Sequence, residues 1–381
     1  MTIKQKYPDY LCDKNGELIE LPPPVPVPDE ATYQRVRQEA LAFSEERRLN
    51  YEKFKSSAAR DCVSEFMPTR IDIENVSRCN FRCTMCQVSD WPKGTRARDM
   101  TLGEFKKLID EQYGLVEVKI QGLGEPTMQG DTFFEMIRYA RSKKIWVRVV
   151  TNASLLHLKD NYKKLIDSDV NEIQISIDGA TKEVYEGIRR GSKFEQVVEN
   201  CKMINAYSAE LGIERTKMWT VVQTANQHQV PEIVRLGAEM GFKHMAFSLN
   251  LIDFGLEEWK ENNAALSVET IFTNRQAVEC MKLGESLGVT TRFWRQTHKY
   301  DTDRPENLCP WPFERGYVSS DMRVVPCCIL GNPDVAELGS AKNLTETWNG
   351  ETWQQFRQDH LDGNIPDVCK LCYRGGDDEE G

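Results

Sequence analysis

Three cysteines stand close together near residue 80. Cys79, Cys83 and Cys86 lie in the run CNFRCTMC, with three residues and then two residues between them. Structural zinc sites usually have four ligands and paired two-residue spacings. Three thiolates on one short loop can instead hold three irons of a [4Fe–4S] cluster and leave the fourth iron open to a small molecule with an amine and a carboxylate. A zinc site or three incidental thiols is the alternative that this spacing leaves open.

A glycine-rich run follows about 35 residues later. Residues 121–126 read QGLGEP and include Gly122, Gly124, Glu125 and Pro126. Glycines let the backbone approach a ligand closely, and the Glu125 carboxylate can pair with an ammonium group. Taken alone, the run is also compatible with an ordinary tight turn.

A second set of cysteines lies near the end of the chain. Cys309, Cys327, Cys369 and Cys372 are separated by 17, 41 and 2 residues. A two-residue pair with two distant partners can hold zinc or a second iron–sulfur cluster. Cys328 directly follows Cys327, and neighbouring side chains of an extended segment point to opposite faces. We therefore expect Cys327 to be a ligand and Cys328 not to be one.

These residues need a scaffold, and the chain between residues 70 and 254 alternates predicted strands and helices. The strands are expected at Ile71–Val76, Leu115–Gln121, Ile145–Thr151, Glu172–Ile177, Lys217–Thr224 and His244–Leu249. The helices are expected at Leu102–Glu111, Thr132–Ser142, Lys159–Asp167, Lys182–Ala209 and Val230–Met240. This α/β alternation predicts a parallel sheet with outer helices, either a curved partial barrel or an open sheet. Thr151, Asn152 and Gln223 end two of the strands, where an active site is expected, and ordinary turn chemistry is their alternative role.

The flanking segments differ from this central part. Residues 1–69 contain a proline-rich connector and a charged, helix-favouring stretch at Glu30–Ser56, which we interpret as an extension that docks on the main domain. Beyond the central part, a helix at Val268–Leu287 and a strand at Val289–Phe293 precede the cysteine-rich tail. The predicted organisation is therefore three parts: 1–69, 70–254 and 255–381.

The cysteine loop and the QGLGEP run resemble two motifs of the radical S-adenosylmethionine (SAM) enzymes. In that family the second motif has the form Gly-x-Gly-Glu-Pro, which QGLGEP matches. The resemblance implies a partial, TIM-like (β/α)6 barrel in which SAM chelates the open iron and is cleaved to a 5′-deoxyadenosyl radical. It places Met85 beside the adenine and assigns Glu125 to the ammonium of SAM. The stretch ISIDGATKEVYEGIRRG is similar to one that supplies a serine and an arginine to the ribose and carboxylate of SAM, here Ser176 and Arg189. A turn-capping hydroxyl and a surface charge are the alternatives for these two residues.

The tail resembles the twitch domain, the short form of the SPASM domain, which binds one auxiliary [4Fe–4S] cluster. The resemblance implies that Cys309, Cys327, Cys369 and Cys372 hold all four irons. The chain departs from the usual pattern at Met322, which stands where a glycine normally precedes the second cysteine by five positions. That change puts the local hairpin in doubt and not the ligands.

The resemblance implies a hydrogen-abstracting oxidoreductase that receives an electron from a flavodoxin- or ferredoxin-type donor. A fully ligated second cluster can accept an electron, so we expect two-electron oxidation of the substrate. The tail spacing resembles that of twitch dehydrogenases acting on aminocyclitol alcohols, and this resemblance implies that the oxidised group is an alcohol or amine carbon of a carbohydrate- or aminocyclitol-like small molecule. One alternative is a redox-neutral epimerase in which the Cys328 thiol returns the hydrogen atom. A ribosomal-peptide maturase and a non-catalytic zinc-binding scaffold are the others.

Charge and composition restrict the partners. The chain has 49 Lys and Arg against 59 Asp and Glu, a formal net charge of −10. This acidic balance argues against broad binding to nucleic acid or anionic membranes. The sequence has no membrane-length apolar run, and its first ten residues lack the apolar core of a secretory signal, so we expect a cytoplasmic protein. In that compartment, twelve cysteines indicate metal or redox chemistry before disulfides.

Overall fold

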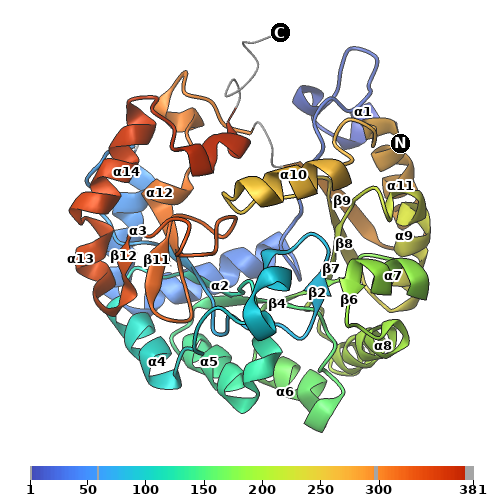
Figure 1. Ribbon diagram of the computed structural model, residues 1–381, viewed down its shortest axis with the longest axis horizontal. Helices are drawn as coiled ribbons and strands as arrows, with labels where there is room; N and C mark the ends of the chain where they lie inside the picture. Colours follow the sequence, from blue (N-terminus) through green and yellow to red (C-terminus); the bar gives the residue numbers. More distant parts are fainter. Residues whose placement is uncertain (1, 58–59, 296–298, 374–381) are drawn as a thin grey trace.

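The computed structural model describes residues 2–57, 60–295 and 299–373, which form a curved sheet with helices on its outside (Figure 1). The sheet runs in the order β12-β11-β10-β1-β3-β4-β5-β7-β8-β9, and the strands from β10 to β9 are parallel. Its strands are β1 (Arg70–Ile73), β3 (Glu117–Ile120), β4 (Trp146–Thr151), β5 (Glu172–Ser176), β7 (Thr216–Val221), β8 (His244–Ser248), β9 (Thr290–Trp294), β10 (Arg315–Val318), β11 (Arg323–Val325) and β12 (Gly339–Ser340).

The six predicted strands are confirmed as β1, β3, β4, β5, β7 and β8, within a few residues at each end. The predicted strand after them is confirmed as β9, and β10 adds a further parallel strand beside β1. The helices are α1 (Ile3–Lys6), α2 (Glu30–Phe43), α3 (Glu45–Ser56), α4 (Leu102–Glu111), α5 (Asp131–Ser142), α6 (Asn161–Asp167), α7 (Lys182–Ile188), α8 (Phe194–Glu210), α9 (Val230–Glu239), α10 (Glu257–Leu266), α11 (Asn274–Ser286), α12 (Trp311–Glu314), α13 (Leu344–Trp348) and α14 (Glu351–Leu361).

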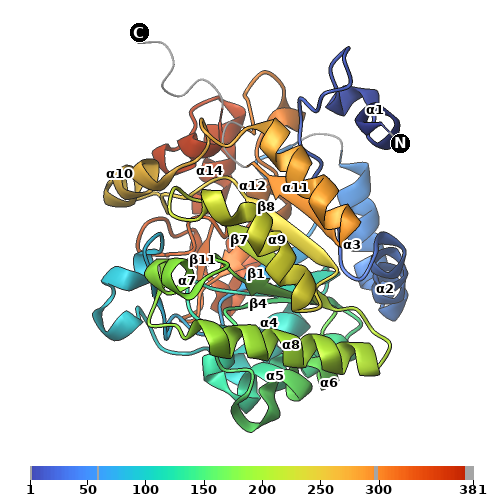
Figure 2. The ribbon, with the colours of Figure 1, turned by 90° about the vertical axis from the view of Figure 1, so that its right-hand side faces the viewer.

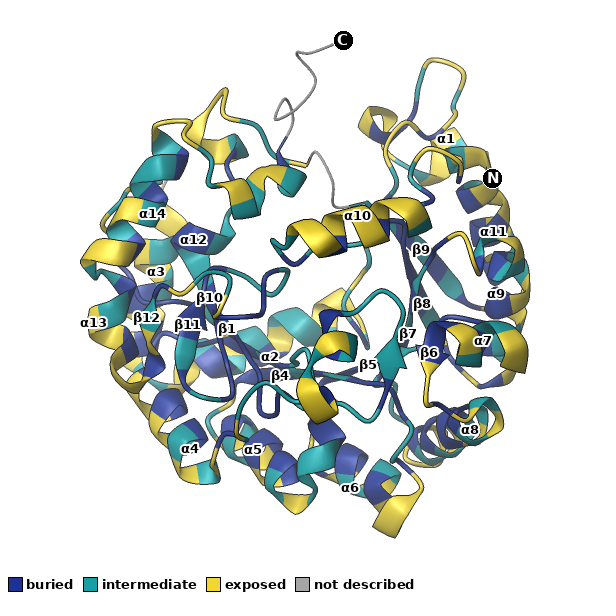
Figure 3. Cartoon of the chain, in the orientation of Figure 1, coloured by how far each residue is buried: buried dark blue, intermediate teal, exposed yellow. Residues whose placement is uncertain are grey.

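The strands alternate between an apolar outer face and a charged inner face. On β1 and β3, side chains such as Ile71 and Val118 are fully buried in the core that the outer helices complete, as the dark strands of Figure 3 show. The residues between them meet inside the barrel, where Glu117 pairs with Arg70 at 3.5 Å and with Arg148 at 3.4 Å. Because successive side chains of a strand point to opposite faces, this pattern gives the barrel an ionic interior.

The N-terminal extension closes one end of this interior. Val27 is fully buried, and its backbone N–H donates to Glu172 at 3.3 Å. Lys217 donates to the carbonyl of Val25 at 3.2 Å, and the Tyr33 hydroxyl donates to Glu117 at 2.9 Å. Glu117 and Glu172 begin their strands, so the extension covers the N-terminal ends, while α10 lies at the other end of the barrel (Figure 2). The predicted docking of this extension is confirmed.

Three helix predictions need correction. The single helix expected at Lys182–Ala209 is wrong: α7 ends at Ile188, and β6 (Arg189–Arg190) pairs with β2 (Arg82–Cys83) before α8 begins. Gly191, with φ of +87°, reverses the chain there. The Glu30–Ser56 stretch is two helices because the Ser44 side chain caps the second one. The helix expected from Val268 begins only at Asn274, after a capping box formed by Thr273 and Gln276.

The C-terminal part is continuous with the barrel sheet. Strand β10 pairs with β1 over the whole of β1, and β11 and β12 extend the sheet in antiparallel fashion. The division at residue 254 falls between β8 and α10 and stays a prediction. The β10–β11 turn does form, with Met322 at φ +68° and its side chain buried. No helix of the described part of the chain is long and apolar enough to cross a membrane.

Candidate functional site

The three clustered cysteines lie on the loop that leaves β1. All three cysteines are half-buried and lie close enough to interact electrostatically. Desolvation and the nearby Glu125 charge raise the pKa of Cys79 well above its usual value, and desolvation with the Cys83 sulfur raises the pKa of Cys86 to about 12. Hydrogen bonds hold the loop: the Phe81 N–H donates to the Cys79 sulfur at 3.4 Å, and the Ser89 hydroxyl donates to the Cys83 carbonyl at 2.6 Å. Thiols that resist ionisation become thiolates when a metal replaces the proton, so this group fits metal ligation.

Arg189 stands directly against this loop. Its backbone pairs with Cys83 in the β2–β6 ladder, and its guanidinium lies 2.7 Å from the buried Asp178 carboxylate. The Asp178 charge raises the pKa of Arg189, whereas Arg189 acts to lower the pKa of the Cys83 thiol. Arg189 is therefore a buried, fixed cation beside a cluster cysteine and not a surface charge. Sequence reasoning missed Asp178, although it stands two positions after Ser176, which is half-buried at the end of β5.

Glu125 is buried and is held by four donors. Its Oε1 accepts from the Thr127 hydroxyl and the Thr151 hydroxyl, both at 2.6 Å, and from the Thr127 N–H at 3.2 Å. Its Oε2 accepts from the Asn152 N–H at 2.7 Å. Thr151 and Asn152, predicted to line the site, therefore orient Glu125. Burial still raises the pKa of Glu125 above its usual value, because among the described residues no cation offsets the cost of burying its charge.

The two glycines of QGLGEP serve the protein's own packing. A Cβ on Gly124 would lie 2.4 Å from the Val76 carbonyl oxygen and 2.5 Å from that of Arg78. A Cβ on Gly122 would lie 2.6 Å from the Glu74 side chain. The two glycines thus let the QGLGEP turn approach the segment that leads into the cysteine loop. The Glu125 N–H completes the contact by donating to the Arg78 carbonyl at 2.8 Å, and Pro126 begins the next turn.

Two further elements reach the same end of the barrel. Gln223, just after β7, is fully buried, and neither atom of its amide has a hydrogen-bond partner among the described residues. Helix α10, which sequence reasoning did not predict, contacts the cysteine loop: Asn262 donates to the Thr84 carbonyl at 3.3 Å and Asn263 to the Met85 carbonyl at 3.5 Å. An unpartnered buried amide at a strand end fits a site built for a polar ligand.

The four tail cysteines line a single, largely apolar pocket. Cys309, Cys327, Cys369 and Cys372 share it with side chains that include Phe356 and His360. The Cys309 N–H donates to the Tyr373 hydroxyl at 2.9 Å, which ties the first of these cysteines to the end of the described chain. Four thiols in one dry pocket fit a fully ligated cluster.

Cys328 lies outside that pocket. Its electrostatic neighbours are Asp72, Lys119 and Arg70, which belong to the inner face of β1 and β3, and burial raises its pKa to about 11. Cys327 instead interacts with Cys309 and Cys369. The two adjacent thiols therefore face opposite sides, one toward the tail pocket and one toward the barrel interior.

The two cysteine sites are packed against each other. Asn332, after the second tail cysteine, donates to the Gln87 side chain next to Cys86 at 3.1 Å. A Cβ on Gly331 would lie 3.3 Å from the Leu123 side chain of the glycine-rich turn. The segment that follows Cys327 and Cys328 thus contacts both the cysteine loop and the turn that carries Glu125.

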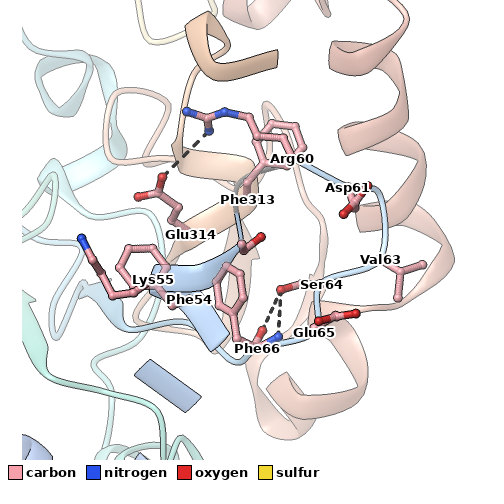
Figure 4. A pocket seen from close by; sticks show the side chains of 11 residues that line it. Phe54, Lys55, Arg60, Asp61, Val63, Ser64, Glu65, Phe66, Phe313 and Glu314 are labelled. Atoms are coloured by element: carbon pink, nitrogen blue, oxygen red, sulfur yellow. Dashed lines mark hydrogen bonds and ion pairs between the residues drawn. The ribbon is translucent and has the colours of Figure 1, made fainter. Parts of the chain in front are cut away.

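A second pocket lies beside the tail pocket, since Arg60, which lines it, donates to the Cys309 carbonyl at 3.2 Å. It has a volume of about 500 Å³ and is lined by residues that include Phe54, Arg60 and Phe313 (Figure 4). None of the predicted site residues lines it. Among the described residues, no three His, Cys, Asp or Glu side chains are grouped closely enough to hold a single metal ion.

Comparison with known proteins agrees with this geometry. The family model of the radical SAM superfamily matches residues 76–237, and the model of the SPASM iron–sulfur cluster-binding domain matches residues 309–373. The chain therefore contains a radical SAM domain and a SPASM domain. These two domains imply SAM and two iron–sulfur clusters, for which the cysteine loop and the tail pocket supply fitting residues.

Two of the curated relatives each match about half of the chain. The mycofactocin maturase MftC of Mycolicibacterium smegmatis is 29% identical over 185 residues, which are 48% of this chain and 45% of the relative. The tungsten-containing aldehyde ferredoxin oxidoreductase cofactor-modifying protein of Pyrococcus furiosus is 26% identical over 49% of this chain and 52% of its own length. The chain thus spans about half the length of these relatives.

Solved structures share the fold. SuiB of Streptococcus suis, bound to the precursor peptide SuiA, superposes with a TM-score of 0.60 at 15% identity, over 81% of this chain and 69% of that one. The structure of anSMEcpe with bound AdoMet superposes with a TM-score of 0.56 at 19% identity, over 80% and 88%.

Proposed function

We propose that this radical SAM protein is a maturase that oxidises a residue of a peptide substrate. When bound, SAM supplies a 5′-deoxyadenosyl radical, and an iron–sulfur cluster in the tail pocket supplies a one-electron acceptor. The observation that carries the oxidative part is the tail pocket itself, where four cysteines leave no iron of a cubane open to substrate.

The names of similar proteins support a peptide substrate. A relative at 29% identity is a maturase, and solved neighbours are described with the precursor peptide SuiA and with the Cp18Cys peptide. They support a peptide better than the carbohydrate-like substrate that the tail spacing suggests. A flavodoxin- or ferredoxin-type electron donor is part of the proposal.

Within this proposal, the described residues bind and orient. Cys79, Cys83 and Cys86 would hold the SAM cluster, and Arg189 would stabilise its negative charge. Glu125, fixed by four hydrogen bonds, would accept a hydrogen bond from the ammonium of SAM. The positive charge of that ammonium would stabilise the ionised carboxylate, which burial now disfavours. Met85, Ser176 and Gln223 would line the remaining SAM surface. Helix α10 would limit water access over the cysteine loop through Asn262 and Asn263.

The test is substrate-stimulated cleavage of SAM by anaerobically reconstituted protein. The candidates are peptides encoded beside the gene and, in parallel, a panel of aminocyclitols and hexoses. We expect a peptide to stimulate 5′-deoxyadenosine release and to lose two hydrogen atoms by mass spectrometry. Stimulation by a sugar and by no peptide would overturn the peptide assignment.

Two specific observations favour alternative functions. The ionic inner face near Lys119 and Asp72 favours oxidation of a polar carbohydrate or aminocyclitol, which the sugar panel tests. The orientation of Cys328 toward that face favours a redox-neutral epimerase in which its thiol returns a hydrogen atom. Cys328→Ala would abolish epimerisation, with solvent deuterium absent from the product, and would spare oxidation.

A further inference from the structure

Lys119 differs from the other cations on the inner face of the sheet. Arg148 lies 3.3 Å from Glu172, and Lys217 lies 2.8 Å from the same carboxylate. Arg70 is 3.3 Å from Asp72. For Lys119, by contrast, the described residues provide no carboxylate within ion-pair distance and no hydrogen-bond partner, and its side chain is only half-buried.

The carboxylate beside Lys119 is already engaged. Asp72 is the cross-strand neighbour of Lys119 in the β1–β3 register. Its Oδ1 accepts from Arg70, and its Oδ2 accepts from the Gln121 amide at 2.5 Å. Each oxygen of Asp72 is thus held by one of these two neighbours, and Lys119 is not within ion-pair distance of either oxygen, so its amine stays available to a molecule in the barrel.

The position of Lys119 relates it to both halves of the site. It stands two residues before Gln121, where the QGLGEP turn begins, and so lies on the strand that carries Glu125 toward SAM. The Cys328 thiol, adjacent in sequence to a tail-pocket cysteine, is among its electrostatic neighbours. Lys119 is thus linked to the QGLGEP turn by its strand and to the segment after Cys327 by its interaction with Cys328.

The surrounding charges favour loss of its proton. Burial lowers the pKa of Lys119, and the nearby Arg70 of β1 and Arg148 of β4 lower it further. Asp72 and Cys328 act in the opposite direction without overcoming the burial. Lysines in such surroundings are suited to general-base catalysis, because a lowered pKa favours the neutral amine that can accept a proton.

We propose that Lys119 is the catalytic base that removes the proton from the substrate radical. The inference rests on the oxidation proposed above. With SAM bound, hydrogen-atom abstraction would leave a substrate carbon radical next to an O–H or N–H group. That proton would pass to the Lys119 amine, one electron would pass to an acceptor of the iron–sulfur class, and the carbon would form a C=O or C=N double bond. The substrate thus loses one hydrogen atom, one proton and one electron.

The first test needs no substrate. Competitive labelling of the reconstituted protein with trace acetic anhydride, read by peptide mass spectrometry over a pH series, reports the ionisation of each lysine. We expect Lys119 to reach half-maximal reactivity at a lower pH than the exposed lysines of the same sample. A midpoint equal to or above theirs would overturn the inference, whatever substrate is found.

The second test uses whichever substrate class, peptide or sugar, gives product. Lys119→Arg keeps a cation but not an available base, and Lys119→Met removes both. We expect both variants to release 5′-deoxyadenosine within about threefold of the parent while product falls by about 100-fold or more. If Lys119 only held a substrate anion, Lys119→Arg would restore product and Lys119→Met would mainly raise KM, which would contradict the base role. Failure of every peptide alongside turnover of a sugar would reject only the peptide assignment.

Discussion

The two cysteine sites of this molecule are built in opposite ways. The cysteine loop brings Cys79, Cys83 and Cys86 together within eight residues of chain, and a single ladder, β2 with β6, braces it. The tail pocket collects cysteines spread from residue 309 to residue 372: Cys309 and Cys327 come from two separate segments, and Cys369 and Cys372 share the short helical turn Asp367–Cys372. The first site is therefore local and depends on the turn beneath it, whereas the second exists only when the C-terminal fold has formed around it.

Substituting one cysteine in each site should give the largest difference between the functions of the two sites. Cys83→Ala should abolish 5′-deoxyadenosine formation, because it removes a ligand of the SAM-binding cluster. Cys369→Ala should lose about half of the iron and all oxidised product, yet retain SAM cleavage. Iron analysis and chromatography of deoxyadenosine measure both effects, with Cys280→Ala as the control outside both sites. SAM cleavage that failed equally in both variants would contradict their separation.

The packing of the cysteine loop against the QGLGEP turn can be disrupted by a substitution at Gly124. Gly124→Ala would place a Cβ 2.4 Å from the Val76 carbonyl oxygen, where only backbone lies and little can yield. We expect a loss of about 1–3 kcal/mol in stability and poor assembly of the first cluster, while the tail cluster still forms. Thermal denaturation and iron analysis check this. Gly187→Ala is the matched control, since nothing lies within 4 Å of its Cβ; equal behaviour of the two variants would refute the packing argument.

The fold was predictable wherever local pattern decides it. Alternating apolar residues located the six strands and α4, and the three-then-two spacing located the first cysteine site. The break between α7 and α8 was not predictable, because Arg189 and Arg190 leave the helix to pair with a loop more than a hundred residues earlier. Asp178, the orientation of Cys328 and the contact of α10 with the cysteine loop also depend on tertiary packing. Helical periodicity carries no information about such long-range partners.

Glu125→Gln tests the SAM-binding role of the first site by a change that keeps the size of the side chain. The amide would present donor hydrogens to the hydroxyls and N–H groups that now donate to the carboxylate, and it would remove the charge facing SAM. We expect SAM binding weaker by about 10- to 150-fold, the range for loss of a charged hydrogen bond. Equilibrium binding of SAM to the reconstituted protein measures this, with the exposed Glu135→Gln as the control. Unchanged affinity would remove Glu125 from the SAM site.

The smallest expected effect concerns the tail hairpin at Met322. Met322→Gly should relieve about 1–2 kcal/mol of left-handed strain but lose about 1.5–3 kcal/mol of side-chain burial. We expect a net destabilisation of no more than about 2 kcal/mol in chemical denaturation, with both clusters retained. A clear gain in stability would mean that the hairpin needs a glycine and that burial of Met322 contributes little.

We expect one cluster to have an iron open to SAM and the other to have all four irons bound by cysteines. The most direct test is electron paramagnetic resonance of the reduced protein with and without SAM. The account predicts about eight irons per chain and two reduced-cluster signals, of which SAM alters one and leaves the other unchanged. A single signal, or two signals that respond alike to SAM, would contradict it.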